Sequence, residues 1–326
     1  MTRHNVILVG DIGGTNARFA IADPITLDLH HTGYRRTADF ATLCDALQSY
    51  LAQEASGLIP THAAIAVASP VGEDKIKLTN NHWQFSVAAL KQQLALAELR
   101  MLNDFTVQAL AIPHLQSQDF TRIGPDVPAR PLEAIGVLGP GTGLGVSGLI
   151  PNGCGGYAPI SGEGGHSGIV AETEQEIEIL RFLWKEFGRS SIERIICGSG
   201  IVVLYRALCH IRSVTSNDYA PEDITRLALA GECGICHDAI MQFCAFLGGF
   251  AGDLALTLGA RGGIYIAGGV VPRFGDMFAQ SPFRARFENK GRFQQYLAAI
   301  PTYVVAPHDN PALLGAASIF QETKRA

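Results

Sequence analysis

Several common functional signatures are missing from this chain. No GxxxxGK[ST] pattern occurs among its 326 residues, so a Walker A phosphate loop is excluded. No run of basic residues is interleaved with aromatic ones, and the formal net charge is −5, which argues against nucleic acid or an anionic membrane as a partner. Residues 1–9 lack the long apolar core and the cleavage site of a signal peptide, so we expect a cytoplasmic protein.

Cysteine is also sparse. Its seven residues are an odd number spread through a long chain, which favours reduced thiols over a disulfide framework. Residues 233–237 read CGICH, the literal pattern of covalent haem attachment, but such attachment belongs to exported proteins. No second CxxC completes a zinc site. We therefore interpret Cys233 and Cys236 as inert thiols beside or inside a helix.

Glycine, in contrast, is abundant. The 36 glycines exceed the usual share of about 7%, and they cluster in loops, where we expect the function to lie. Single cores seldom grow beyond about 250–300 residues, so a chain of this length predicts two domains. Short apolar runs, such as residues 63–68, alternate with segments of helical spacing, such as residues 39–55, and this alternation predicts an α/β fold.

The first glycine-rich stretch is GDIGGTN, at residues 10–16. It lies between two apolar runs, residues 6–9 and 19–22, and therefore predicts a β-hairpin. Its glycines allow a ligand to approach the backbone closely, so the turn could hold a phosphate. It carries one carboxylate, Asp11, no lysine and no GxGxxG fingerprint. A tight turn without a ligand explains the same residues equally well.

A second hairpin repeats this device. Residues 134–138 form an apolar run that leads into GPGTGLG at 139–145 and out through residues 146–150. A shift of 129 positions places Gly10 over Gly139 and Gly14 over Gly143. Two such hairpins indicate two related halves of the chain.

Two polar sites each have a structural and a functional interpretation. Asn103 and Asp104 follow a short strand and precede a helix, where side chains enter the cleft of an α/β domain but also cap helices. Ser190 stands three residues before Glu193, which fits a capping box for the next helix.

Three other segments carry structural predictions. Residues 239–260 are apolar enough to raise the possibility of a membrane span, but Gln242 and Asp253 favour a buried core helix whose glycines let a neighbour approach. Residues 117–131 contain three prolines and little periodicity, which predicts a surface connection. Residues 311–321 predict a last helix with proline at its start.

Five motifs together resemble the bacterial glucokinase family of the hexokinase and actin-like ATPase superfamily. They are GDIGGTN at 10–16, LNDF at 102–105, GPGTGLG at 139–145, GEGGH at 162–166 and IAGGVVPRF at 266–274. The resemblance runs in order from near residue 5 to near residue 320, and this shared order makes it specific.

The resemblance implies an actin-like ATPase fold. Two α/β domains, each built on a mixed five-stranded sheet of the ribonuclease H type, would enclose the active site in the cleft between them. The small domain would comprise residues 1–114 and 305–326, and the large domain residues 115–304. The last helix would cross back to the small domain.

The resemblance also implies the roles of individual residues. Asp104 would be the general base that accepts the proton of the sugar hydroxyl. Asp11 would hold magnesium through water, as a hydrated ion. The residues expected to contact the sugar are Asn103, Asp104, Glu163, His166 and Glu193, with Ser69, Asn80 and His82 nearby. The residues expected to contact ATP are Gly10, Asp11, Ile12, Gly13, Gly14, Thr15, Gly141, Thr142, Gly143, Gly268 and Gly269.

The resemblance implies the activity of a glucokinase that uses ATP and Mg²⁺ to make glucose 6-phosphate for glycolysis, and it implies a homodimer. One alternative is a related kinase for mannose, fructose or an amino sugar. The cysteine-rich zinc motif of the ROK kinases, CxCGxxGCxE, is absent. The other alternative is a non-catalytic sugar sensor, against which the presence of Asp104 argues.

Overall fold

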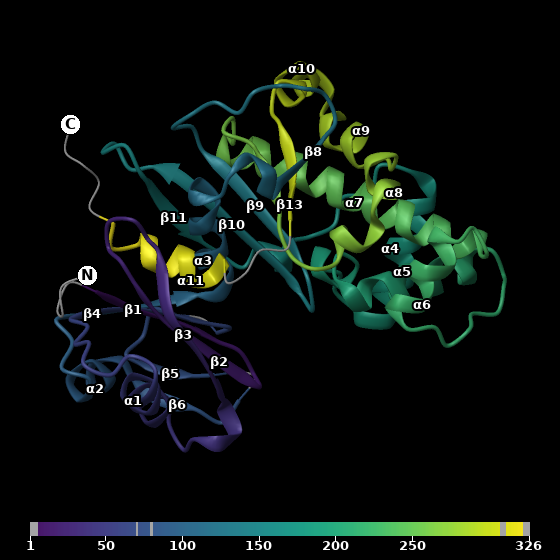
Figure 1. Ribbon diagram of the computed structural model, residues 1–326. Helices are drawn as coiled ribbons and strands as arrows, with labels where there is room; N and C mark the ends of the chain where they lie inside the picture. The colour runs from purple at the N-terminus through teal and green to yellow at the C-terminus, as the bar shows by residue number, and fades with distance from the viewer. Residues whose placement is uncertain (1–5, 70, 79–80, 307–310, 322–326) are drawn as a thin grey trace. The chain divides into compact units, whose positions relative to one another are not determined.

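The computed structural model describes residues 6–69, 71–78, 81–306 and 311–321. The chain divides into two compact units. The first unit is Met1–Leu115 with Asn152–Pro159 and His308–Ala326, and the second is Gln116–Pro151 with Ile160–Pro307. Each unit contains a mixed β-sheet with helices packed against it (Figure 1), which confirms the predicted α/β class.

The first sheet brings three strand ends to one edge. Its order is β3-β2-β1-β4-β7, with β1 antiparallel to β2 and parallel to β4, and β4 parallel to β7. The register aligns Ile12, Val67 and Asn103, so the carboxyl ends of β1, β4 and β7 lie together. The strands are β1 (Ile7–Ile12), β2 (Asn16–Ala22), β3 (Leu29–Arg36), β4 (His62–Val67) and β7 (Glu98–Asn103), with a separate pair β5 (Lys75–Lys77) and β6 (Gln84–Ser86).

Helices cover both faces of this sheet because its side chains alternate between two cores. Leu8 and Ile12 of β1 belong to the core that includes α1, whereas Ile7 and Val9 belong to the core that includes α3 and α11. A Cβ on Gly315 of α11 would lie 1.7 Å from a backbone oxygen of α3, so glycine allows these helices to touch. The helices are α1 (Leu43–Gln53), α2 (Val87–Gln93), α3 (Asp104–Ala111) and α11 (Pro311–Ser318).

The second sheet has six strands in the order β11-β10-β9-β12-β13-β8. Strand β9 is antiparallel to β10 and parallel to β12. Strand β1 has the same pattern of neighbours, antiparallel β2 and parallel β4, so the two hairpins occupy equivalent positions in their sheets. The strands are β8 (Phe120–Ile123), β9 (Ile135–Pro140), β10 (Leu144–Pro151), β11 (Tyr157–Ser161), β12 (Ile264–Ile266) and β13 (Thr302–Val305).

The expectation of five strands in this sheet, and of a plain connection at residues 117–131, was wrong. Strand β8 pairs antiparallel with β13 at the edge of the sheet. It has four residues, too few to show a periodicity, and the prolines that suggested a loop all follow it. Its pairing therefore depends on β13, which lies far along the chain.

Helix α7 is the core helix of the second unit, as predicted. It is the one helix in the described part of the chain that is long and apolar enough to cross a membrane, but 72% of its most apolar window is buried. Gly248 and Gly252 face backbone oxygens of α9, which a Cβ would approach to 2.1 and 2.5 Å. The helices are α4 (Glu174–Phe187), α5 (Gly198–Ile211), α6 (Pro221–Leu229), α7 (Gly234–Leu258), α8 (Asp276–Ala279), α9 (Phe283–Glu288) and α10 (Gln294–Ala298).

Candidate functional site

The turn of the first hairpin is held by hydrogen bonds from its own unit. The N–H of Gly13 donates to the Asn16 carbonyl at 2.9 Å, so this donor is used inside the turn. The Thr37 hydroxyl donates to the carbonyl oxygens of Gly14 and Thr15 at 2.8 and 3.1 Å. The turn is therefore a fixed structure, and Thr37 is a supporting residue that no local motif indicated.

Asp11 lies near a second carboxylate. Burial raises the pKa of Asp11, the charge of Arg18 opposes this rise, and the charge of Asp104 adds to it. Arg18 is the register partner of Asp11 across the hairpin, and Asp104 follows the aligned end of β7. The first unit therefore brings together the predicted magnesium-associated residue and the predicted base.

This pair of carboxylates suits a hydrated cation. The described residues contain no group of three or more His, Cys, Asp or Glu side chains that could hold a metal directly. Burial is the main cause of the raised pKa of Asp11, and a cation would offset both this burial of charge and the smaller repulsion from Asp104. Mg²⁺ usually keeps several of its waters and binds near one or two carboxylates, so these residues fit the ion that the resemblance implies.

Asn103 is the N-cap of α3, which was the structural role predicted for it. Its side-chain oxygen accepts hydrogen bonds from the N–H groups of Phe105 and Thr106, at 2.9 and 3.2 Å. Asp104 is the first residue of the helix, at its positive end. A role of Asn103 at a sugar would therefore use its amide nitrogen, since the oxygen is engaged.

The polar loop after β5 contacts the first hairpin. The amide nitrogen of Asn81 donates to the Gly13 carbonyl at 3.2 Å. A ring nitrogen of His82 lies 3.0 Å from the Phe40 carbonyl. Ser69 is buried, and Asn80 lies outside the described residues. Asn81, which sequence reasoning passed over, is the residue of this loop that contacts the glycine-rich turn.

In the second unit, the turn of hairpin β9–β10 meets the start of α5. The N–H of Gly141 donates to the Gly143 carbonyl at 2.8 Å, and the Gly141 carbonyl accepts from the N–H of Gly198 at 2.8 Å. Gly198 is the first residue of α5, a helix of 14 residues. The positive end of a long helix therefore adjoins this turn, which favours an anion there.

The GEGGH motif folds against β10 through its glycines. A Cβ on Gly165 would lie 2.3 Å from the Leu144 carbonyl oxygen, and one on Gly164 would lie 2.8 Å from Val146. Only glycine permits this close approach. The loop forms a short 3-10 helix that leaves Glu163 and His166 exposed at its two ends.

Glu193 joins the second hairpin to this loop. Its Oε2 accepts a hydrogen bond from the N–H of Leu144 at 2.9 Å, and its Oε1 lies 4.0 Å from Nδ1 of His166. The predicted capping box is wrong: Glu193 lies in the 3-10 helix Ile192–Arg194, whose N-cap Ser191 makes no side-chain capping bond. The chain turns here to reach α5, and the Glu193 carboxylate binds the hairpin β9–β10 rather than capping a helix.

Gly268 brings the end of β12 against the same hairpin. It has a φ of +82°, and a Cβ there would lie 2.4 Å from the Pro140 carbonyl oxygen. Both features require glycine. Gly269 is exposed, and a Cβ on it would meet no atom within 4 Å. Gly268 therefore lets the loop after β12 pack against the hairpin, and Gly269 leaves open space beside that loop.

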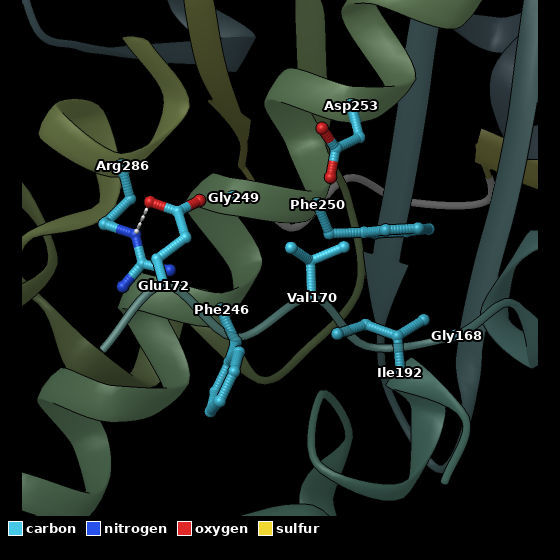
Figure 2. Close-up of a pocket in the computed structure, with 9 residues that line it drawn as sticks. All are labelled: Gly168, Val170, Glu172, Ile192, Phe246, Gly249, Phe250, Asp253 and Arg286. Atoms are coloured by element: carbon cyan, nitrogen blue, oxygen red, sulfur yellow. Dashed lines mark ion pairs between the residues drawn. The ribbon is translucent and has the colours of Figure 1, made fainter. Parts of the chain in front are cut away.

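The segment that follows the GEGGH loop is fixed at both ends. The N–H of Ile192 donates to the Ser167 carbonyl at 2.9 Å, next to Glu193. At the other end, Nε of Arg286 lies 3.0 Å from Oε2 of Glu172. Figure 2 shows this ion pair, in which the side chains of Glu172 and Arg286 face each other beside α7. No sequence signal connects these residues, which are far apart in the chain.

The pocket drawn in Figure 2 lies behind this segment. It is lined by Val170, Ile192 and Phe250, among others, and has a cavity volume of about 20 Å³. That volume admits about one water molecule, so a sugar cannot bind there.

Glu176 holds Arg286, one of the residues that line this pocket. Burial acts to raise the pKa of Glu176, but hydrogen bonds from Arg286, from the Glu172 N–H and from Gln242 hold the pKa below its usual value.

Comparisons with known proteins identify the family of the chain. The family model described as Glucokinase matches residues 8–323. A glucokinase of Chromobacterium violaceum is 45% identical over 313 residues, covering 95% of this chain and 88% of the relative. A glucokinase of Nitrobacter hamburgensis is 46% identical over 316 residues, covering 96% of each chain.

Solved structures show the same similarity. The crystal structure of a glucokinase from an Antarctic psychrotroph has a TM-score of 0.90 and 37% identity, covering 97% of this chain and 98% of the other. A ROK family glucokinase from Streptomyces griseus, solved in complex with glucose and AMPPNP, has a TM-score of 0.60 and 18% identity, covering 96% and 98%. The second likeness concerns the fold, which the sugar kinases of the actin-like ATPase class share.

Proposed function

Because the chain belongs to the glucokinase family, we propose that it transfers the terminal phosphoryl group of ATP to D-glucose and forms glucose 6-phosphate. The observation that carries the proposal is the placement of Asp104 beside Asp11, at the edge where β1 and β7 end. Phosphoryl transfer needs a base for the attacking hydroxyl close to the residues that manage phosphate charge.

The sugar would be held by side chains with complementary hydrogen-bonding groups. Asp104 would accept the proton of the attacking hydroxyl, and the amide nitrogen of Asn103 would donate to a neighbouring hydroxyl. Glu163, His166 and Glu193 would bind the remaining hydroxyls. The contact of Glu193 with Leu144 supports this role, because it fixes one carboxylate oxygen and leaves the other directed toward His166.

ATP would be held largely by backbone groups. The N–H groups of Gly13 and Gly141 are used inside their turns, so other N–H groups of the turns Gly10–Thr15 and Gly141–Gly143 would face the phosphates. The second turn has the positive end of α5 behind it. Gly268 and Gly269 would let the adenosine approach. Magnesium held through water near Asp11 would neutralise phosphate charge when bound. We propose that residues 1–114 with 305–326 and residues 115–304 act as separate domains that both contribute to catalysis.

The wider setting follows from the same family. We propose that the enzyme is cytoplasmic, feeds glycolysis and forms a homodimer. The rival activities are those of a kinase for mannose, fructose or an amino sugar, and a sensor without turnover. A coupled assay across a sugar panel separates them, because a glucokinase has its highest kcat/KM with glucose and a sensor shows none.

The decisive variant is Asp104→Ala. We expect kcat to fall by about 10²–10⁴-fold, the usual contribution of a positioned general base, while circular dichroism and the melting temperature stay close to those of the wild type. The matched control is Asp126→Ala, since the Asp126 side chain is 89% exposed in a surface loop of the second unit. Wild-type turnover in Asp104→Ala would remove this residue as the base.

A further inference from the structure

Helix α7 begins with two thiols that the proposed kinase chemistry does not use. Cys233 is the N-cap of the helix, and Cys236 lies in its first turn. The N–H of Cys236 donates to Sγ of Cys233 at 3.4 Å. Cys236 is fully buried, whereas Cys233 is half-buried. The complete burial of Cys236 also leaves no room for a haem thioether in the folded protein.

The geometry of this turn permits a disulfide. Side chains three residues apart on a helix have Cβ atoms about 5–6 Å apart, and a small adjustment at the N-cap brings them into the range of a disulfide. The N-cap residue has an extended backbone, with φ −143° and ψ 110°, and is not constrained by the helix. A Cβ on the intervening Gly234 would meet no atom within 4 Å, so the outer side of the turn is open.

The two thiols differ in the way that a reactive pair requires. Burial raises the pKa of Cys236 to about 12, and a hydrogen bond and charge from Cys233 add to the rise. Cys236 therefore stays protonated and inaccessible in the resting protein. Cys233, in contrast, is half-buried at the N-cap, so its sulfur is the one of the two that a dissolved oxidant can reach.

We propose that Cys233 and Cys236 form a reversible intramolecular disulfide by exchange with a low-molecular-weight disulfide of the glutathione type. The thiolate of Cys233 attacks one sulfur of the oxidant, whose S–S bond breaks and releases one thiolate. The sulfur of Cys236 then loses its proton and attacks Sγ of Cys233, which releases the second thiolate. Two protein thiols are oxidised, the oxidant is reduced to two thiols, and both protons pass to the leaving thiolates.

The alternative partner for Cys236 is Cys209 of α5. Its charge also contributes to raising the pKa of Cys236, so the two sulfurs are neighbours. Cys209 is 1% exposed, however, and a dissolved oxidant reaches Cys233 first. Cys236 therefore forms its disulfide with Cys233 in preference to Cys209.

The test titrates the full chain in buffers from fully reduced to fully oxidised glutathione and quenches each sample with acid. The protein is then denatured, so that buried thiols are accessible, alkylated with N-ethylmaleimide near neutral pH and analysed by mass spectrometry. We expect the wild type to lose two of its seven alkylable thiols together, both from the peptide that contains residues 233–236. In Cys233→Ser, the remaining thiol of the pair, Cys236, should stay alkylable at every glutathione ratio. Cys236→Ser should carry one glutathione on Cys233, because the second step is blocked.

The matched control is Cys154→Ser, which removes an exposed cysteine and should titrate as the wild type does. Cys236→Ala repeats the second variant if serine prevents folding at this buried position. Full alkylation of the oxidised wild type, glutathione found on Cys154 alone, or a disulfide between Cys209 and Cys236 would each overturn the proposal. The readout is independent of kinase activity, so it stands apart from the proposed function.

Discussion

Substituting Gly143 by alanine tests whether the second hairpin positions Glu193. A Cβ on Gly143 would lie 2.6 Å from Oε2 of Glu193, whereas ordinary contact begins near 3.4 Å. The carboxylate must therefore retreat by about 0.8 Å, which takes it out of hydrogen-bonding range of the Leu144 N–H, now at 2.9 Å. Because the obstructing atom ends a flexible side chain, the fold should persist and the carboxylate should move.

The expected loss follows from this single contact. A hydrogen bond to a charged group contributes about 1.5–3 kcal/mol, and each 1.4 kcal/mol corresponds to about tenfold in rate. Gly143→Ala should therefore lower kcat/KM for glucose by about 10- to 100-fold. The melting temperature should fall by several degrees at most, about 2–4 °C for each kcal/mol lost, since the hairpin keeps its strand pairing.

The assay couples glucose 6-phosphate formation to NADPH production, with glucose varied at saturating ATP. Gly168→Ala is the control in the same unit, because a Cβ there would meet no atom within 4 Å and the residue has no role in the proposed site. The double variant Gly143→Ala/Glu193→Gln should be no worse than Glu193→Gln alone, since both changes remove one interaction. Losses that multiply in the double variant, or wild-type kinetics in Gly143→Ala, would refute the reasoning.

Three further outcomes are expected. Gly268→Ala places a Cβ 2.4 Å from a carbonyl oxygen at a φ of +82°, so thermal unfolding should show a loss of about 1–3 kcal/mol, whereas Gly269→Ala should match the wild type. Asp11→Ala should raise KM for ATP more than KM for glucose in initial-rate kinetics, and the reverse order would contradict its assignment. Glu176→Gln removes a buried ion pair with Arg286, which keeps Glu172 as a second partner, and should cost about 1.5–3 kcal/mol in urea unfolding at neutral pH. Because the folded-state pKa of Glu176 is lowered, its contribution is complete above the unfolded-state value near 4.5 and fades as the pH falls through the folded value, so wild type and variant should converge in acid.

Features encoded by neighbouring residues could be predicted from the sequence. Both glycine-rich hairpins follow from apolar runs on either side of a glycine turn, and the structure confirms them as β1–β2 and β9–β10. The serine cap of α2 is likewise local: Oγ of Ser86 accepts from the N–H of Ala89 at 3.1 Å. The burial of α7 could be predicted because Gln242 and Asp253 interrupt its apolar sequence.

Features that depend on distant segments could not be predicted. Strand β8 exists because β13 offers it an edge, and four residues alone carry no such signal. The spacing of Ser190 and Glu193 fits a capping box, yet Glu193 binds the N–H of Leu144, 49 positions away. The pairing of Arg286 with Glu172 is similarly non-local. Site roles for individual residues came from the shared order of the motifs rather than from physical patterns.

The packing of α11 has a consequence for how the chain is made. The face of β1 and β4 that carries Val9 and Ala64 is covered by α3 and by α11, and α11 is synthesised only after the second unit. At about 5–20 residues per second, the ribosome needs on the order of 10–40 s to make the segment between α3 and α11. During that interval, while the second unit is being synthesised, the first unit has an uncovered apolar surface. The nascent chain is therefore most prone to aggregate through its earliest residues, and loss of α11 would leave it permanently in that state.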